Sequence, residues 1–378
     1  MDELTLVAVL HDQPSPAADP APAVREEGRR RLLERAAGRS HRSRRPNRRT
    51  VLRLGLATTA AAVTTAGAVL LATASFGPAP SPPSHEAGGT PQARRFLLVA
   101  AERTARDQRG DGRYWHVAML STDQFRVGEP GARYTLREQQ YEESWIGRTP
   151  DLPGLRVEQH RGVRPASAAD AAAWKRAGSP RTVPVPALMR RGGSNFTLHV
   201  SGPRPAQRSA VSGDEARSLG FAPGFSMRIR MGELRHFPAE PARLRDHLAR
   251  RYKVPDERLF GVLSVLLMEL PVTPQVRAAA FRLMAGIEGV RVIEGIQPAA
   301  GGGRHLEGGR GTAVAVRVSD RRIGVIEQRL IIHPDSGRAV HTETVVVEPG
   351  GVNRDFAPGD WTHATTVSHA AWVDRLPD

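Results

Sequence analysis

The residue types best suited to acid–base or metal chemistry are the thirteen histidines, and they are scattered along the chain. His363 and His369 form the tightest pair with the same strand parity, and Asp360 precedes them. Imidazole and carboxylate groups are common zinc ligands. An extended strand, however, would hold the two rings about 20 Å apart. The spacing therefore predicts no shared metal ion.

Motifs for covalent catalysis and nucleotide binding are absent. The sequence has no H-E-x-x-H and no G-x-S-x-G, and residues 224–228 lack the second glycine of the latter. The glycine-rich stretch 301–311 lacks a G-K-[ST] ending and precedes an expected strand, so we expect a floppy connection there. The absence of cysteine excludes disulfides and thiolate sites. We predict that the chain is not an enzyme and has no catalytic, cofactor-binding or metal-binding residues.

Two further groups of side chains are candidates for a site. Glu142 and Glu143 are adjacent, and neighbouring side chains of a strand point to opposite faces, so they cannot act as a pair. The aromatic side chains are concentrated in one region of the chain, at Tyr114, Trp115, Tyr134, Tyr141 and Trp145. Core packing is the favoured explanation, and an aromatic-lined groove for a ligand or partner is the alternative.

The chain is strongly basic, with 54 Lys and Arg against 39 Asp and Glu and a net charge of +15. Nearly all of the positive charge is arginine, because Lys175 and Lys253 are the only lysines. Twelve arginines and seven acidic residues give residues 1–53 a charge of +5, which leaves +10 on the remainder. No recognition motif accompanies this charge, so we predict no specific nucleic acid partner.

Residues 54–76 form an uncharged run of 23 residues with eight alanines, five threonines and seven large apolar side chains. As a helix, the run would span about 35 Å, enough to cross a bilayer once. Arg48, Arg49 and Arg53 flank it on the N-terminal side, whereas residues 77–90 contain no Lys or Arg. The positive-inside rule then predicts a single-pass protein of the cell membrane with a cytoplasmic N-terminus and an extracellular C-terminal domain.

An uncleaved signal anchor is the favoured reading of residues 54–76, and two others compete with it. Residues 72–74, Ala-Thr-Ala, fit a processing site, and residues 47–53 loosely resemble a twin-arginine export signal. A basic region of about fifty residues is too long for an ordinary signal peptide, which weighs against cleavage. A buried alanine-rich helix in a soluble protein is the remaining alternative.

This placement divides the chain into four parts. Residues 1–53 are a basic cytoplasmic tail, short-helical or disordered, and residues 54–76 are the transmembrane helix. Residues 77–91 are a proline-rich linker. Residues 92–378 are the exported domain, and the lipid bilayer is a partner of the whole chain.

The exported domain is expected to be α+β: a helix, strands, helices and then an antiparallel meander. Helices are expected at 92–107, 168–176, 241–252, 256–270 and 273–289. Strands are expected at 113–121, 133–147, 155–160, 196–200, 290–297, 312–319, 323–333, 338–348 and 362–373. Between 178 and 224 the sequence otherwise reads as loops. In the helix at 273–289 one apolar face is expected to pack on the sheet that follows, through Val276, Ala280, Leu283 and Ile287.

Several features in this order resemble a family of uncharacterised actinobacterial single-pass membrane proteins. They are the opening Met-Asp-Glu-Leu, the basic tail, the single anchor, Tyr-Trp-His-Val at 114–117, Trp-Ile-Gly at 145–147 and Pro-Asp-Ser-Gly at 334–337. Members are often encoded beside sigma-factor genes. The resemblance implies an anti-sigma-like role, in which the tail holds a sigma factor and the exported domain senses an external signal. The histidine–cysteine zinc motif of many anti-sigma domains is absent here.

Two functions follow as hypotheses. The favoured one is a membrane-tethered regulator with a tail that binds a cytoplasmic protein and an exported domain that senses. The alternative is a cell-envelope binding or carrier module for an apolar ligand, comparable in outline to lipoprotein-carrier folds. The sequence identifies neither the ligand nor a cofactor.

Overall fold

The computed structural model describes residues 89–107, 109–185, 196–212, 216–221, 225–305 and 309–377. All of them belong to the second of two compact units, Pro80–Asp378. The expected tail, the segment 54–76 and Arg48, Arg49 and Arg53 lie outside the described residues. No helix within the described ranges is long and apolar enough to cross a membrane.

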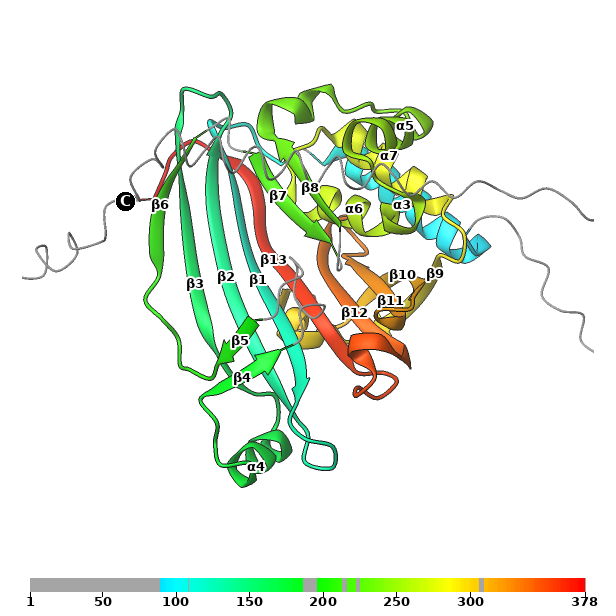
Figure 1. Ribbon diagram of the computed structural model, residues 1–378. Helices are drawn as coiled ribbons and strands as arrows, with labels where there is room; N and C mark the ends of the chain where they lie inside the picture. Colours follow the sequence, from blue (N-terminus) through cyan, green and yellow to red (C-terminus); the bar gives the residue numbers. More distant parts are fainter. Residues whose placement is uncertain are drawn as a thin grey trace, which may run out of the picture. The chain divides into compact units, whose positions relative to one another are not determined.

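Strands from both ends of this unit form one antiparallel sheet in the order β6-β3-β2-β1-β13-β12-β11-β10-β9 (Figure 1). The protein is therefore mixed α+β with a large antiparallel sheet. The strands are β1 (Tyr114–Val127), β2 (Tyr134–Gly147), β3 (Pro153–Pro165), β6 (Gln207–Ser212), β9 (Arg291–Ile296), β10 (Gly311–Asp320), β11 (Gly324–Ile332), β12 (Ala339–Pro349) and β13 (Trp361–Val373).

The expected meander is confirmed, because β9 to β13 are consecutive neighbours in the sheet. Between β11 and β12 the chain turns at Gly337, whose φ of 69° suits glycine and whose N–H donates to the His333 carbonyl oxygen at 2.9 Å. The sequence does not reveal that β13 continues the sheet by pairing with β1. Tyr114 lies opposite Val373 in that register, so the first strand of the domain, β1, is paired with its last strand, β13.

Helices cover one side of the sheet, which we call the helix side. They are α3 (Pro91–Arg106), α5 (Pro241–Tyr252), α6 (Asp256–Glu269) and α7 (Pro274–Ala285). The side chain of Thr90 accepts from the Ala93 N–H and caps α3, so this helix begins at residue 91, one residue before the start expected at 92. Of these helices, α6 makes the contacts with β11, β12 and β13. The apolar side chains of α6 pack with Val314, Val316 and Val318 of β10 in the larger of the hydrophobic clusters, which we call the main core.

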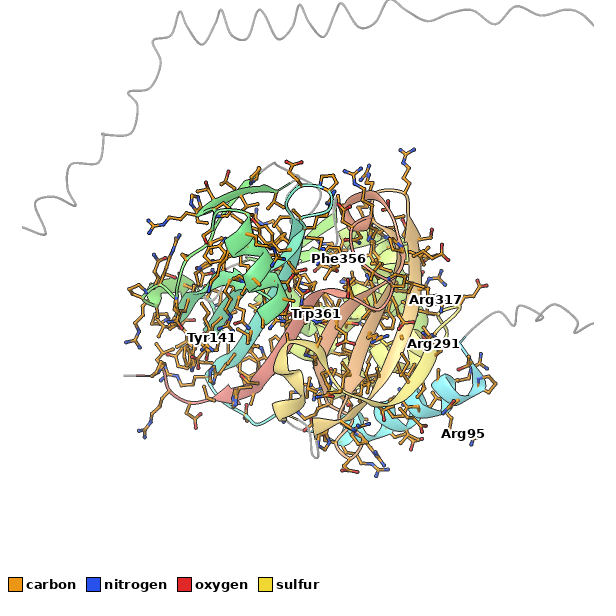
Figure 2. The ribbon with its side chains drawn as sticks, turned by 90° about the horizontal axis from the view of Figure 1, so that it is seen from below. Arg95, Tyr141, Arg291, Arg317, Phe356 and Trp361 are labelled. Atoms are coloured by element: carbon orange, nitrogen blue, oxygen red, sulfur yellow. The ribbon has the colours of Figure 1, made fainter. Side chains whose placement is uncertain are left out.

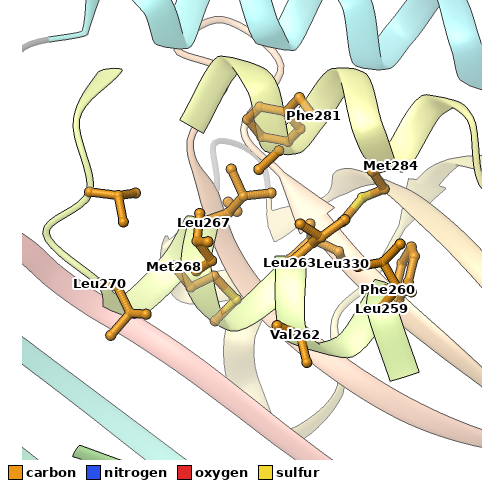
Figure 3. Packing of buried hydrophobic residues seen from close by; sticks show 14 of the residues in the cluster. Leu259, Phe260, Val262, Leu263, Leu267, Met268, Leu270, Phe281, Met284 and Leu330 are labelled. Carbon is orange, nitrogen blue, oxygen red and sulfur yellow. The ribbon is translucent and has the colours of Figure 1, made fainter. Parts of the chain in front are cut away.

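The expected packing of α7 on the sheet is wrong. Helix α7 contacts α3, α5 and α6, and Figure 3 shows α6 between α7 and the strands. Val276, Ala280 and Phe281 are buried between helices, so α7 is apolar on several sides instead of one. The helix also ends earlier than expected, at Ala285.

Smaller elements cover the helix side of the sheet over β1, β2 and β3. The hairpin of β4 (Thr182–Val185) and β5 (Phe196–His199) contributes Val183, Val185 and Leu198 to a second core beneath it, completed by residues of β1, β2 and β3. Helix α4 (Ala168–Arg176) lies beside β2 and β3. A further hairpin, β7 (Ala216–Phe221) and β8 (Phe225–Arg230), adds Ile229 to the main core. The sequence reading missed β4, β6, β7 and β8, because short strands between turns carry little periodicity.

Candidate functional site

Polar side chains interrupt the helix side of the sheet between the two cores. Alternate residues of a strand share one side. On β1, Trp115, Val117 and Met119 enter the main core, and Phe125 and Val127 enter the second core. Ser121 and Asp123 lie between them on the same side, and the neighbouring strands repeat this pattern. We call the set the polar strip: Ser121, Asp123, Glu138, Glu142, Arg156, Glu158, His160, His363 and Thr365.

Four of these side chains form a hydrogen-bonded row across β1 and β13. Asp123 Oδ1 lies 2.8 Å from His363 Nδ1, and His363 Nε2 lies 3.1 Å from Thr365 Oγ1. Thr365 Oγ1 in turn lies 3.2 Å from Ser121 Oγ. A carboxylate that orients an imidazole beside a hydroxyl is the arrangement that activates nucleophiles in hydrolases. Here the Thr365 hydroxyl is enclosed, since Thr365 is 6% exposed.

The strip is acidic although the chain as a whole is basic. It holds four carboxylates, Asp123, Glu138, Glu142 and Glu158, against the single guanidinium of Arg156. Glu138 Oε1 lies 3.1 Å from His160 Nε2, and Glu142 Oε1 lies 3.8 Å from Arg156 Nε. The side chains of these four partners are 13–26% exposed, so the strip is half-buried. Such a surface suits a polar or cationic ligand better than an apolar one.

A second cluster occupies the opposite side of the same strands, and we call it the His116 cluster. His116 Nε2 lies 2.7 Å from Glu143 Oε1, and the Tyr141 hydroxyl donates to Glu143 Oε2 at 2.8 Å. The His116 ring stacks on Trp145 at 4.4 Å and 11°, and it also lies 4.4 Å from the His369 ring. Figure 2 labels Tyr141 of this cluster on β2. Trp361 of β13 and Arg291 of β9 are labelled in the same view and lie farther along the sheet.

The environment of the His116 cluster keeps two of its members neutral. Burial, together with the hydrogen bond to Glu143, raises the pKa of Tyr141 to about 12. Burial and the nearby His116 and Arg338 lower the pKa of His369. A neutral phenol and a neutral imidazole can donate or accept hydrogen bonds but supply no strong nucleophile.

The structure places His363 and His369, which the sequence analysis considered together as possible metal ligands, on opposite sides of the sheet. His363 lies against Asp123 on the helix side, whereas His369 lies against His116 on the opposite side. Among the described residues no group of three or more His, Asp or Glu side chains is placed to hold a metal ion. Glu142 and Glu143 face opposite sides as expected, toward Arg156 and His116.

The aromatic concentration divides among three environments. Trp115 lies in the main core and Tyr134 in the second core, as core packing predicts. Tyr141 and Trp145 belong to the His116 cluster instead. Of the polar strip, Glu142 and His363 were singled out from the sequence, and the other residues were missed. Polar side chains at core-facing positions of an otherwise apolar strand are a signal that can be read from the sequence.

The first part of the glycine-rich stretch, residues 301–303, is packed, in contrast to the flexible connection that we expected. The segment η3 (Ala299–His305) consists of short 3₁₀ turns with a kink at Ala300 and Gly301, where φ is positive, and it contacts β12 and β13. A Cβ on Gly302 would lie 2.5 Å from His341 Nδ1. The backbone approaches the His341 ring so closely that only glycine fits at this position.

Comparison with known proteins adds little to this picture. No protein-family model matches the chain, and no curated protein does. Among solved structures, the crystal structure of a DUF1329 family protein from Desulfovibrio piger aligns with 8% identity over 76% of this chain and 95% of that one. The TM-score of 0.17 is too low for the likeness to support an argument about fold or function.

Proposed function

We propose that the protein is a membrane-tethered regulator, anchored once by residues 54–76, whose exported domain senses a polar ligand. The polar strip is the observation that supports this most. A strand face between two cores would be more stable with apolar side chains, because each half-buried carboxylate loses part of its hydration. Such a stretch is expected where a surface is kept for binding.

The outer face of α3 is consistent with a position close to a bilayer. Among the described residues, Leu98 and Val99 are the exposed large hydrophobic side chains, at 41% and 40%. Arg94 and Arg95 are exposed one turn before them on the same helix. Arginines beside exposed apolar side chains suit the boundary between lipid headgroups and water. This helix directly follows the linker from the proposed anchor.

The alternative, a carrier for an apolar ligand, has less support. The helix side of the sheet under α6 is filled by buried side chains, including Leu263, Leu267 and Leu330 (Figure 3). The part left between the cores is polar. We therefore favour a sensor of polar ligands over a carrier.

The topology is tested by fusing to position 91 a reporter that is active only outside the cytoplasm. We expect activity from the wild-type fusion. We also expect less activity when Arg48, Arg49 and Arg53 are changed together to Glu, because the positive-inside signal is lost. A matched control changes Arg29, Arg30 and Arg31 to Glu, far from the segment. Activity only from a cytoplasmic reporter would reject the proposal.

The tail is tested with the full-length chain in membranes of its own host, crosslinked and purified with and without residues 1–40. Recovery of a sigma factor that depends on those residues supports an anti-sigma-like role. Recovery of lipid and nonspecific RNA alone contradicts it. Deletion of 1–40 leaves the arginines beside the anchor in place, so insertion is preserved in the control.

The polar strip is tested by thermal unfolding of full-length protein with spermidine as a cationic probe at constant ionic strength. We expect a rise in Tm that is reduced in Glu138→Gln and unchanged in Glu288→Gln, an exposed position outside the strip. An equal response from both variants would mean that spermidine binds elsewhere.

A further inference from the structure

We infer that the protein has a buried binding site for a small oxyanion or carboxylate, formed by Arg109, Arg277 and Arg338 where α3 ends beside α6 and α7. The inference does not depend on the proposed membrane topology or on the polar strip. Arg109 follows α3, Arg277 belongs to the first turns of α7, and Arg338 lies in the turn before β12. Asp107 is the carboxylate partner of the first two, with Oδ2 at 3.6 Å from Arg109 Nε and 3.9 Å from Arg277 Nη2.

Two of the guanidinium groups are deeply buried and incompletely hydrogen-bonded. Arg109 and Arg277 are 8% and 2% exposed. Arg109 Nη2 donates to the Leu267 carbonyl oxygen at 3.0 Å, and Arg277 Nη1 donates to that of Val272 at 2.8 Å. Arg277 Nη2 donates to the Asp107 carbonyl oxygen at 2.6 Å. Arg109 Nε and Nη1, Arg277 Nε and also Asp107 Oδ2 are buried and have no hydrogen-bond partner.

The charges in this region do not balance. Arg109 and Arg277 share one carboxylate, and the charge of the nearby Arg338 adds to the causes that lower the pKa values of both. Burial, the largest cause, lowers the pKa of Arg109 to about 9 and that of Arg277 to about 10. Both groups therefore stay protonated at neutral pH. Buried positive charge without an equal counter-charge is strongly unfavourable, and a bound anion removes the imbalance.

A purely structural role explains only part of the arrangement. Arg109 satisfies a carbonyl at the end of α6, and Trp115 Nε1 donates to the Glu269 carbonyl oxygen nearby at 2.8 Å. These contacts cap a helix whose final carbonyl groups lack partners of their own. They account for one nitrogen of Arg109 but not for its two other nitrogens. Arg338 Nη2 donates to the Ala370 carbonyl oxygen at 3.3 Å, and no carboxylate of the described residues forms an ion pair with this third guanidinium. Guanidinium groups bind carboxylates and phosphate-like oxyanions through charged hydrogen bonds.

The experiment measures the Tm of the full-length protein with phosphate, sulfate or acetate, each against chloride at the same ionic strength. We expect a saturable rise in Tm. Arg338→Gln keeps the carbonyl contacts of the other two arginines and should weaken the apparent Kd by about tenfold or more. Asp107→Asn removes the competing carboxylate and should tighten it. Arg148→Gln, with a side chain 45% exposed, is the control and should leave it unchanged.

Two comparisons decide the outcome. A stronger response to phosphate and sulfate identifies an inorganic oxyanion, and a response to acetate identifies the carboxylate of an organic ligand. No saturable response, or equal responses in the wild type, Arg338→Gln and Asp107→Asn, would overturn the inference. Because the last two variants are expected to shift the Kd in opposite directions, a general loss of stability cannot imitate the result.

Discussion

His363 Nδ1 lies 2.8 Å from Asp123 Oδ1, although the two residues are 240 positions apart. The contact exists because β13 returns to pair with β1, which places His363 directly opposite Asp123 in the register. The same pairing carries Thr365 to Ser121. One long-range strand pair therefore assembles the centre of the polar strip.

We expect no covalent catalysis from this row of hydrogen bonds. Thr365 is 6% exposed, and its hydroxyl already contacts both His363 and Ser121. Incubation with a fluorophosphonate, followed by intact mass measurement, should show no adduct. A stoichiometric adduct that is lost in Thr365→Val, and retained in the exposed control Thr182→Val, would show that the hydroxyl is a nucleophile.

Gly302→Ala should destabilise the protein by about 1–3 kcal/mol. The added methyl group would meet the fully buried ring of His341, which hydrogen-bonds Thr366 at 2.8 Å and has little freedom to move. Urea unfolding measures the difference. Gly202→Ala is the matched control, because nothing lies within 4 Å of a Cβ there. Equal midpoints for the two variants would contradict the close packing of η3.

Stability should fall in acid partly through Glu343. Burial would raise the pKa of this carboxyl group, but contacts from His341, the Ala299 N–H and Arg329 outweigh it and lower the pKa below the usual 4.5. The unfolded chain therefore binds the proton more readily, so this contribution to stability is present above about pH 4.5 and is lost as pH falls through the lowered pKa.

Thermal unfolding of Glu343→Gln between pH 6 and pH 3 checks this. The variant should be less stable at neutral pH and should lose less stability on acidification than the wild type. Glu288→Gln, at an exposed position, should keep the wild-type pH dependence. If the stability of Glu343→Gln depends on pH as that of the wild type does, the contacts of the Glu343 carboxylate contribute nothing to the loss of stability in acid.

Tyr141 should ionise late in the folded protein. Its pKa is raised to about 12 by burial and by the hydrogen bond to Glu143, and the Arg161 guanidinium opposes this shift from 4.7 Å above the ring. Because the folded state holds the proton more tightly, this stabilisation is complete below about pH 10 and is lost as pH rises toward 12.

Absorbance titration at 295 nm, compared between the wild type and Tyr141→Phe, isolates this group. Glu143→Gln should lower the pKa of Tyr141, since it removes the carboxylate that accepts the hydrogen bond of the neutral phenol. Tyr141→Phe should cost about 1 kcal/mol of stability at neutral pH through the lost hydrogen bond. A midpoint near pH 10 for the difference between the two titration curves would contradict the buried hydrogen bond of Tyr141 to Glu143.

Local sequence signals were sufficient for most helices and strands. The expected helices at 168–176 and 241–252 match α4 and α5, because Ser167 and Glu240 cap them and Pro241 begins α5. The alternation in β10 and the turn before β12 also follow from neighbouring residues. These features depend on interactions within a few positions of the chain.

Only the tertiary structure decided which distant segments meet. The pairing of β1 with β13, the placement of α7 among helices and the sharing of Asp107 by Arg109 and Arg277 join residues that no periodicity links. Such contacts are selected by the burial of whole faces, which is a property of the assembled core and not of any one segment. Composition and the uncharged run at 54–76 led to the topology proposal, whereas the polar strip and the arginine site became visible when the strands and helices were placed together.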